Sequence, residues 1–518
     1  MFRKNILSVS LIIILYSLSL NGQDIKSCLN LMRIEKFNEA KKCFTSLLGS
    51  KSKAEACFYL GEMHLDEVDV DSAKLFYEMG ITANPDFPLN YAGLVKLFLL
   101  NKNNAEAEKN YQLATDIGDD DPATFVHLSE AYSFFFSGSN YDKALTLTDE
   151  ALKIEPDYVD AFISRGNIFL KKGNGTEAIK NFQKAIDAAP TNPEPLVLKA
   201  KVYILITNYN EAASLLNEAV KIDPSYSPVY RELAELNAAL KNYSKASEYY
   251  SQYIESSEIT LEKQKRFASI LYINKEYDKA INILNDVNSK EPDNASTIRV
   301  LAYSYLRIDA IDSSKAYFKQ LFDMPSVEYQ ATDYENYADL LSETGNDSLA
   351  VEYLLKIPEI DSTRDDVYGK VAVICFKKKD WNCVISSLTK KNHITAQENF
   401  DLGKAYYFIG DYQNADSSFA HLSNKVPDLA IAYFWHARVQ TNFDPESDSG
   451  LAKPYYEQFI QFSNEDTTKF KKELIEAYSY LGYYYYIKGE NVNSKTYWQK
   501  VYALDPKNVQ AIEALKSL

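Results

Sequence analysis

Residues 145–156 read LTLTDEALKIEP and residues 179–190 read IKNFQKAIDAAP. In both stretches apolar side chains recur every three or four residues, which is typical of one face of an α-helix, and a proline ends the stretch. The two closing prolines lie 34 residues apart, Pro224 follows at the same interval, and Pro292 follows at twice that interval. A period of this length indicates a chain built from stacked copies of one small structural unit.

Each unit also carries a second, earlier signature. An aromatic residue, two further residues and an alanine recur, as in Tyr209-Asn-Glu-Ala212, and a small residue such as Gly166 or Ala200 lies twelve residues before the alanine. Two helices of about three turns joined by a short loop can pack as an antiparallel hairpin. Because only small side chains fit where the two axes cross, we expect Gly166 to meet Ala178, and Ala200 to meet Ala212.

The order of small residue, aromatic, alanine, aromatic, alanine and proline resembles the tetratricopeptide repeat. The resemblance covers roughly residues 24–506. It implies an all-α fold, an α-α solenoid of about fourteen antiparallel helical hairpins forming a right-handed superhelix. We number the repeats from the alanine, or its substitute, in each second helix. These anchors are Ala40, Ala73, Ala107, Ala144, Ala178, Ala212, Ala246, Ala280, Ser314, Ala350, Val384, Ala415, Ala452 and Ser494.

The repeat array is predicted to occupy residues 23–507. Its spacing departs from 34 in two places, so we expect bends near residues 391 and 444. Residues 508–518 are predicted to form a capping helix that covers the exposed face of the last repeat, as the ends of such arrays require.

The first 22 residues predict a secretory signal peptide. Two basic residues precede an apolar run from Ile6 to Leu20, which is shorter than the roughly 20 apolar residues that span a bilayer. An uncleaved membrane anchor is the alternative. With the signal removed we expect no integral membrane segment, and export to the periplasm, the cell surface or the surroundings of a bacterium.

Composition restricts the partners of this chain. Only 17 glycines and 16 prolines occur in 518 residues, which argues against a loop-rich barrel or sandwich. The formal net charge of −16 makes nucleic acid and anionic membrane surfaces poor partners, because both need clustered lysine and arginine. A protein or peptide partner is the expectation.

No motif for catalysis stands out. The five histidines are dispersed, no Cys-x-x-Cys pair occurs, and no phosphate-binding loop is present, so we expect no metal site and no cofactor. Gly173-Asn-Gly175-Thr-Glu-Ala178 matches a dinucleotide fingerprint, but the repeat pattern places it between two helices, whereas that motif must follow a strand. We therefore expect a protein that is not an enzyme. An active site built from the repeats, with buried carboxylates of shifted pKa, is the remaining alternative.

Four of the five cysteines are candidates for disulfides. Cys28 and Cys43 fall on opposite helices of the first repeat, and Cys375 and Cys383 flank the turn of the eleventh. An exported protein can form such bonds. Either pair could close a hairpin, and the alternative is that these residues are small buried apolar side chains.

By resemblance, the first helices of the repeats line a concave surface. The tenth repeat then offers an acidic stripe of Glu335, Asp339 and Glu343, spaced by four along one helix face. This stripe could bind a basic peptide or a cation. The alternative is that it pairs across the repeat interface with Arg299 and Arg307 of the ninth repeat.

Aromatic and cationic residues gather at the corresponding positions of the last three repeats. Rings supply contact area and cations supply orientation in the recognition of peptides or glycans. The alternative is that these rings pack within the array. The candidate partner-binding residues are Phe400, Lys404, Tyr407, Phe408, Phe434, Arg438, Tyr483 and Tyr486.

The sequence favours a non-enzymatic exported scaffold or adaptor that binds proteins through its concave groove, in the assembly of an envelope or secretion complex. The alternative is a carbohydrate- or nutrient-capture protein of the outer surface, with a binding site built from repeats. Such proteins usually have a lipidated cysteine and loops rich in tryptophan, whereas only 3 tryptophans occur here.

Overall fold

The computed structural model describes residues 24–134 and 140–518. The predicted signal peptide, residues 1–22, lies outside the described residues. The chain forms two compact units, residues 1–304 and 305–518, and each is treated by itself below. This division coincides with neither of the bends predicted near residues 391 and 444, which stay predictions.

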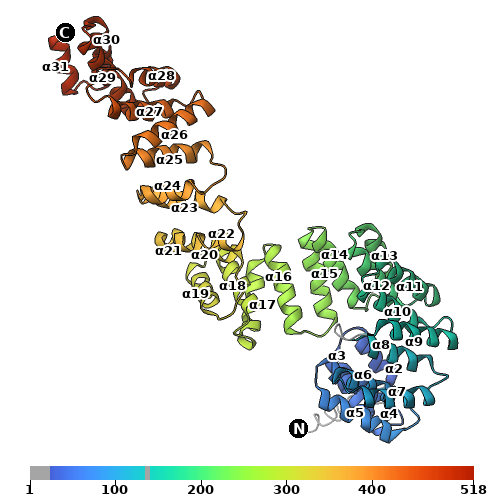
Figure 1. Cartoon of the computed structure of the whole chain (residues 1–518). Helices are drawn as coiled ribbons and strands as arrows, with labels where there is room; N and C mark the ends of the chain where they lie inside the picture. Colours follow the sequence, from blue (N-terminus) through green and yellow to red (C-terminus); the bar gives the residue numbers. More distant parts are fainter. Residues whose placement is uncertain (1–23, 135–139) are drawn as a thin grey trace, which may run out of the picture. The chain divides into compact units, whose positions relative to one another are not determined.

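The first unit is a succession of helical hairpins (Figure 1). A 3-10 turn, η1 (Leu47–Gly49), follows the first hairpin, and α18 (Ala295–Arg307) spans the end of the unit. The hairpins are α2 (Ile25–Arg33) with α3 (Phe37–Ser46), α4 (Lys53–Asp66) with α5 (Val70–Ala83), α6 (Leu89–Leu100) with α7 (Asn104–Ile117), α8 (Pro122–Ser133) with α9 (Tyr141–Ile154), α10 (Val159–Lys171) with α11 (Gly175–Ala188), α12 (Pro193–Leu205) with α13 (Tyr209–Ile222), α14 (Pro228–Ala239) with α15 (Tyr243–Ser256), and α16 (Leu261–Ile273) with α17 (Tyr277–Lys290).

The second unit continues the same pattern. It begins with α19 (Ile311–Asp323), and its last helix, α31 (Val509–Ser517), packs on α30. The hairpins between them are α20 (Ala331–Glu343) with α21 (Asp347–Leu354) and the short α22 (Ile357–Ile360), α23 (Asp366–Lys377) with α24 (Trp381–Leu388), α25 (Ala396–Phe408) with α26 (Tyr412–Lys425), α27 (Ala430–Phe443) with α28 (Lys453–Ser463), and α29 (Lys471–Ile487) with α30 (Asn491–Leu504).

The turn inside each hairpin has a recurring local cause. The first helix ends at a residue in the left-handed backbone region, which reverses the chain, and a side chain then caps the second helix. In the fifth repeat Gly173 has φ 74°, and the backbone N–H of Glu177 donates to the Asn174 side chain at 3.1 Å. The segment that resembles a dinucleotide fingerprint is therefore a hairpin turn. No strand occurs anywhere in the described part of the chain.

The repeat anchors form the centre of the packing. Each of the fourteen anchor side chains named above is at most 1% exposed. Ala200 and Ala212 belong to one cluster of buried residues, as expected for two helices that cross at small side chains. The predicted all-α solenoid of helical hairpins is confirmed. Among the described helices, none combines the length and the apolar character that crossing a bilayer requires.

Candidate partner-binding site

The central feature of the candidate site is the side chain of Lys404, on α25 of the second unit. Its Nζ lies 5.0 Å from the centre of the Phe376 ring, 5.5 Å from that of Phe400 and 4.9 Å from that of Trp435. Three aromatic faces from α23, α25 and α27 therefore surround one ammonium group. Such contacts are favourable because the face of each ring carries partial negative charge.

Lys404 lacks a partner of opposite charge. Within the described residues, no carboxylate oxygen lies within ion-pair distance of its Nζ. Burial lowers the pKa of Lys404, Asp401 opposes this shift, and the charge of Arg438 adds to it. A half-buried ammonium that is incompletely compensated attracts an anion supplied from outside.

Arg438 is, by contrast, fully engaged inside the array. Its guanidinium donates to the Glu476 carboxylate, with Nε 2.7 Å from Oε1, and lies 4.8 Å from the centre of the Phe434 ring. The same carboxylate accepts a hydrogen bond from the Tyr456 hydroxyl at 3.1 Å. Arg438 therefore holds α27 against α29, and its charge is committed before any partner arrives.

The predicted aromatic residues divide into packed and accessible rings. Phe434 is 2% exposed and belongs to the core, Phe400 is half-buried against Phe419, and Tyr407 packs edge-on against Trp435. Phe408 is 47% exposed. The interpretation of these rings as internal packing therefore applies to Phe434 in full and to Phe400 and Tyr407 in part.

Phe408 belongs to a stack that the sequence did not single out. Its ring lies 4.6 Å from that of Trp381 with an angle of 18° between the planes, and it meets Trp435 edge-on at 5.7 Å. Trp381 stands at the aromatic position that begins the second helix of its repeat, so the pattern assigned it to packing alone. We call Trp381, Lys404, Phe408 and Trp435 the cation–aromatic cluster.

Tyr483 and Tyr486 lie in a different place, on α29. They are 43% and 51% exposed, and they line a hollow of about 600 Å³ whose other walls come from α30 and α31. The hollow combines rings with uncharged polar groups and one carboxylate. Its remaining lining residues are Ser479, Trp498, Gln510, Glu513, Ala514 and Ser517.

The acidic stripe is largely neutralised by the following repeat. Glu335 is 3.0 Å from Nη2 of Arg364 and 2.8 Å from Nζ of Lys370, and Asp339 is 3.5 Å from the same lysine. Burial alone would raise the pKa of Glu335, but hydrogen bonds and charge from Lys370 and Arg364 outweigh it and lower the pKa. The stripe thus pairs across a repeat interface, although with partners that the sequence analysis had not named. Glu343 is exposed.

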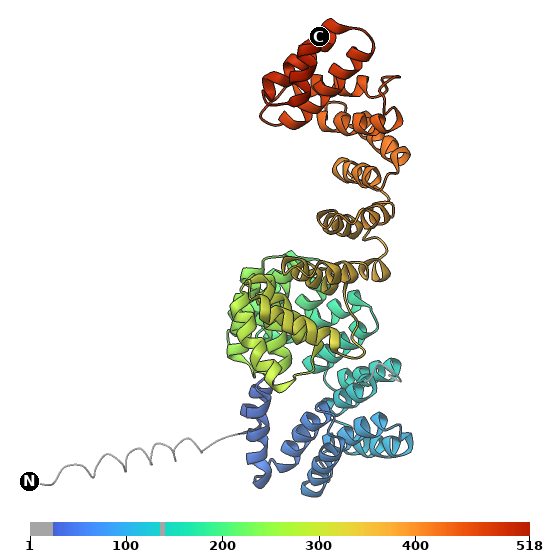
Figure 2. The same ribbon diagram turned by 90° about the vertical axis from the view of Figure 1, so that its left-hand side faces the viewer.

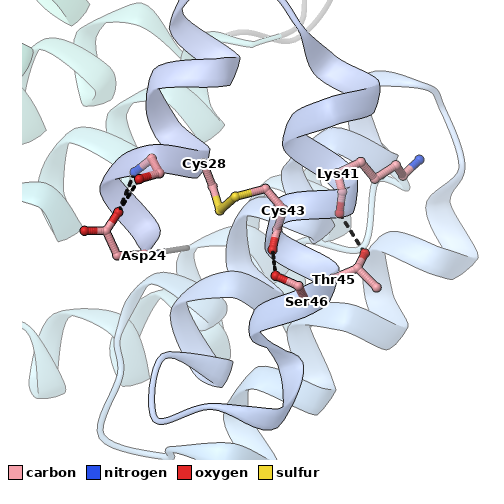
Figure 3. Close-up of a disulfide and its surroundings, with 7 residues drawn as sticks. Asp24, Cys28, Lys41, Cys43, Thr45 and Ser46 are labelled. Atoms are coloured by element: carbon pink, nitrogen blue, oxygen red, sulfur yellow. Dashed lines mark hydrogen bonds between the residues drawn. A yellow bond between two sulfur atoms is a disulfide. The ribbon is translucent and has the colours of Figure 1, made fainter. Parts of the chain in front are cut away.

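Both candidate cysteine pairs are joined in the structure. Cys28 of α2 is bonded to Cys43 of α3, and Cys375 of α23 to Cys383 of α24, while Cys57 is a buried free thiol. Figure 3 shows the first bond closing its hairpin, with Asp24 capping the start of α2 by accepting the backbone N–H of Ser27 at 2.8 Å. Each bond therefore ties together the two helices of one repeat.

Comparison with known proteins gives a consistent family assignment. Residues 120–247 match the family model described as tetratricopeptide repeat protein 21 N-terminal ARM repeat. The C-terminal part of a TPR repeat-containing protein from Cytophaga hutchinsonii is 32% identical, over 48% of this chain and 99% of that chain, with a TM-score of 0.40.

Two more distant solved structures are also similar. A thermophilic TPR protein from Thermus thermophilus is 19% identical over 36% of this chain and 99% of that chain, with a TM-score of 0.30. The human IFIT1 dimer with PPP-AAAA is 14% identical over 75% of this chain and 94% of that chain, with a TM-score of 0.39. No curated protein matches the sequence.

Proposed function

The chain belongs to the tetratricopeptide-repeat family, and from this premise we propose that it is an exported, non-enzymatic adaptor that binds a partner protein at the cation–aromatic cluster. Repeats of this kind present extended surfaces on which segments of other proteins dock. The observation that carries the proposal is Lys404, a half-buried ammonium among three rings with no carboxylate beside it in the described structure.

The cluster favours a segment that carries a carboxylate next to an apolar or aromatic side chain. The carboxylate would compensate Lys404, and the neighbouring side chain would cover the exposed face of Phe408 on its stack with Trp381. Energy in protein interfaces is concentrated in a few buried ring and cation contacts, so a cluster of this size is sufficient for a specific contact.

Two features support export and a role in an envelope or secretion complex. The first 22 residues have the basic start and short apolar run of a secretory signal. The bonds Cys28–Cys43 and Cys375–Cys383 suit an oxidising compartment, because disulfides are rare in the reducing cytosol. Together they favour the periplasm or the cell surface of a bacterium as the place of action.

The experiment is crosslinking capture of partners from bacterial envelopes with the full-length protein and single variants. We expect Lys404→Glu and Phe408→Ala each to reduce capture of the specific partner by about tenfold or more. The matched controls are Lys495→Glu and Tyr502→Ala, two exposed residues on α30 outside the cluster, and these should leave capture unchanged. Recovery of the same partners in equal amounts by all four variants would refute the proposed site.

A second candidate function rests on the hollow around Tyr483 and Tyr486. Exposed rings beside Gln510 and Glu513 are the combination that stacks on a sugar ring and hydrogen-bonds its hydroxyls. A carbohydrate-capture function therefore predicts binding of the purified protein to immobilised glycans. This binding should be lost in Tyr483→Ala and kept in Tyr502→Ala, and an absence of glycan binding by the unaltered protein would exclude this function.

A further inference from the structure

The first hairpin of unit 1 contacts repeats far from it in the sequence. In a repeat array each repeat ordinarily touches only its neighbours. Here the turn between α2 and α3, residues 33–38, lies against α14, α15 and α16, about 190 to 230 residues further along the chain. Figure 1 and Figure 2 show the blue first hairpin reaching the green helices of the same unit. We call residues 33–38 the docking turn.

The carboxylate of Glu35 is the centre of this contact. Its oxygens accept a hydrogen bond from Nη1 of Arg231 at 2.5 Å, one from Nζ of Lys263 at 3.0 Å, and one from the Tyr253 hydroxyl. The three donors come from three consecutive helices, α14, α15 and α16. The inner face of these helices thus forms a pocket that holds one carboxylate.

The same surface also recognises the backbone of the docking turn. The N–H of Glu258 donates to the carbonyl of Glu35 at 3.0 Å, and the Glu258 side chain accepts the N–H of Asn38 at 2.7 Å. The hydroxyl of Ser227 donates to the carbonyl of Ile34 at 2.5 Å. Contacts to a carboxylate and to the main chain around it identify the shape of a turn, and not only its charge.

The residue at this turn differs from its equivalents. Glu35 has φ 59°, in the left-handed region, where a residue other than glycine costs on the order of 1 kcal/mol. Equivalent turns of other repeats mostly carry lysine or glycine, and Asp309 is a second acidic one. Those lysines and glycines are Lys102, Lys241, Lys275, Lys379, Gly173, Gly345, Gly410 and Gly489. Since a lysine at residue 35 would repel Arg231 and Lys263, the acid here matches the surface that it meets.

The docked state is built so that the turn can be exchanged. Nearly all its contacts are polar, and such contacts re-form with another carboxylate at little net cost. The hairpin does not depend on them, because the Cys28–Cys43 bond closes it and its core includes Leu60 and Met63 of α4. A hollow of about 440 Å³ beside the turn, lined in part by Val197 and Tyr226, leaves room for a longer segment.

We propose that the inner face of α14–α16 is a second partner-binding surface, specific for a turn that bears a carboxylate, and that the chain's own docking turn occupies it until an acidic segment of a partner protein displaces it. The occupant is a protein segment with a glutamate or aspartate at the tip of a tight turn. This surface lies in the first unit, apart from the cation–aromatic cluster of the second, so the two proposals fail independently.

The first step of the test measures whether Glu35 holds the turn. In full-length Glu35→Lys, hydrogen exchange at the amide of Glu258 should accelerate by about tenfold or more, because its acceptor moves away. Asp309→Lys is the matched control, since Asp309 is an acid at the equivalent turn of another repeat, and it should leave this amide protected. Unchanged protection in Glu35→Lys would overturn the proposal at once.

The second step measures recognition between separate molecules, with a second full-length copy as the probe. Glu35→Lys keeps the surface but lacks the acidic turn, whereas Arg231→Glu/Lys263→Glu keeps the turn but lacks the surface. Each protein should be monomeric alone, and an equimolar mixture should form a heterodimer in analytical ultracentrifugation. Circular dichroism and the retained Cys28–Cys43 bond verify that both are folded.

Two outcomes of the mixing experiment are decisive. A heterodimer that forms with Glu35→Lys, but not when Asp309→Lys takes its place, supports a surface that binds the turn in trans. A mixture that stays monomeric, although exchange at Glu258 shows that the surface of Glu35→Lys is open, overturns the proposal and leaves the contact as an internal support of the first unit.

Discussion

The ring of Phe182 occupies the space in which residue 166 would carry a side chain. A Cβ atom added to Gly166 would lie 2.5 to 2.9 Å from three carbons of that ring, and Phe182 is completely buried. The same relationship joins Gly403 to Phe419 and Gly482 to Trp498 in other repeats. The small residue of the repeat pattern thus receives a ring from the second helix of its own hairpin.

This contact predicts that Gly166→Ala destabilises the first unit. Alanine gains about 1 kcal/mol of helix propensity over glycine, but overpacking of a buried site costs roughly 1 to 3 kcal/mol. We expect a net loss of up to about 2 kcal/mol in the free energy of unfolding, measured by urea titration of circular dichroism. Gly49→Ala, whose Cβ would meet nothing within 4 Å, is the control. Equal stability of Gly166→Ala and the wild type would show that Phe182 moves aside freely.

The cysteine pairing predicts a simple result in thiol labelling. Cys28, Cys43, Cys375 and Cys383 are bonded in the structure, and Cys57 is free but buried. Alkylation of the purified protein in denaturant without reductant should add one label, and five after reduction, as measured by intact mass. Alkylation of the native protein should be slow, because burial shields the Cys57 thiol and raises its pKa. Three or five labels without reductant would contradict the pairing.

The docking turn should open in acid. Burial by itself would raise the pKa of Glu35, but the charges of Arg231 and Lys263 and the hydrogen bond from Tyr253 outweigh it and hold the pKa below its usual 4.5. A carboxyl group with a lowered pKa in the folded state contributes stability above the unfolded pKa, and this contribution is lost as the pH falls through the folded pKa. The loss therefore belongs to the pH range below about 4.5.

Hydrogen exchange at the Glu258 amide measures this opening. After correction for the intrinsic exchange rate, protection should fall between about pH 6 and about pH 3.5 in the wild type. Glu35→Gln should show weaker protection and little dependence on pH, because it cannot ionise. A wild-type profile as flat as that of Glu35→Gln would mean that the carboxylate does not control the contact.

Most of the fold could be predicted from the sequence, because the repeat constrains it many times over. One misread repeat changes little when the same alanine or small substitute recurs, and even Val384 and Ser494 proved to be buried anchors. The sequence could not show that Gly166 is covered by Phe182, because a period gives the spacing along the chain but not which side chain fills a space. Nor could it show the division after Ser304, since the pattern continues across it.

The candidate site was predictable only in part. Helical spacing brought Lys404 and Phe408 to one surface, but it could not distinguish Lys404, which lacks a carboxylate among the described residues, from Arg438, which pairs with Glu476. That difference depends on contacts between repeats. The Glu35 contact was missed for a related reason: its partners lie more than 190 residues away, and only the closure of the first unit brings them together.

Lys404 should weaken the fold while it serves binding, and Lys404→Met tests this. Methionine has a similar length and needs no hydration, whereas the half-buried ammonium is compensated only by ring contacts, each worth about 0.5 to 2 kcal/mol. We expect Lys404→Met to be as stable as the wild type or up to about 1 kcal/mol more stable near neutral pH, in urea titrations. Lys495→Met, at an exposed site, should show no change.

The pH dependence of this difference follows from the lowered pKa of Lys404. The folded wild type releases this proton at a lower pH than the unfolded chain, so its stability rises with pH up to the unfolded value of 10.5. The advantage of Lys404→Met should therefore shrink as the pH approaches 10.5, while partner capture by Lys404→Met stays weak at every pH. A Lys404→Met protein that is less stable than the wild type by more than about 1 kcal/mol would show that the rings alone compensate the charge. In that case Lys404 belongs to the structure of the array and not to its binding surface.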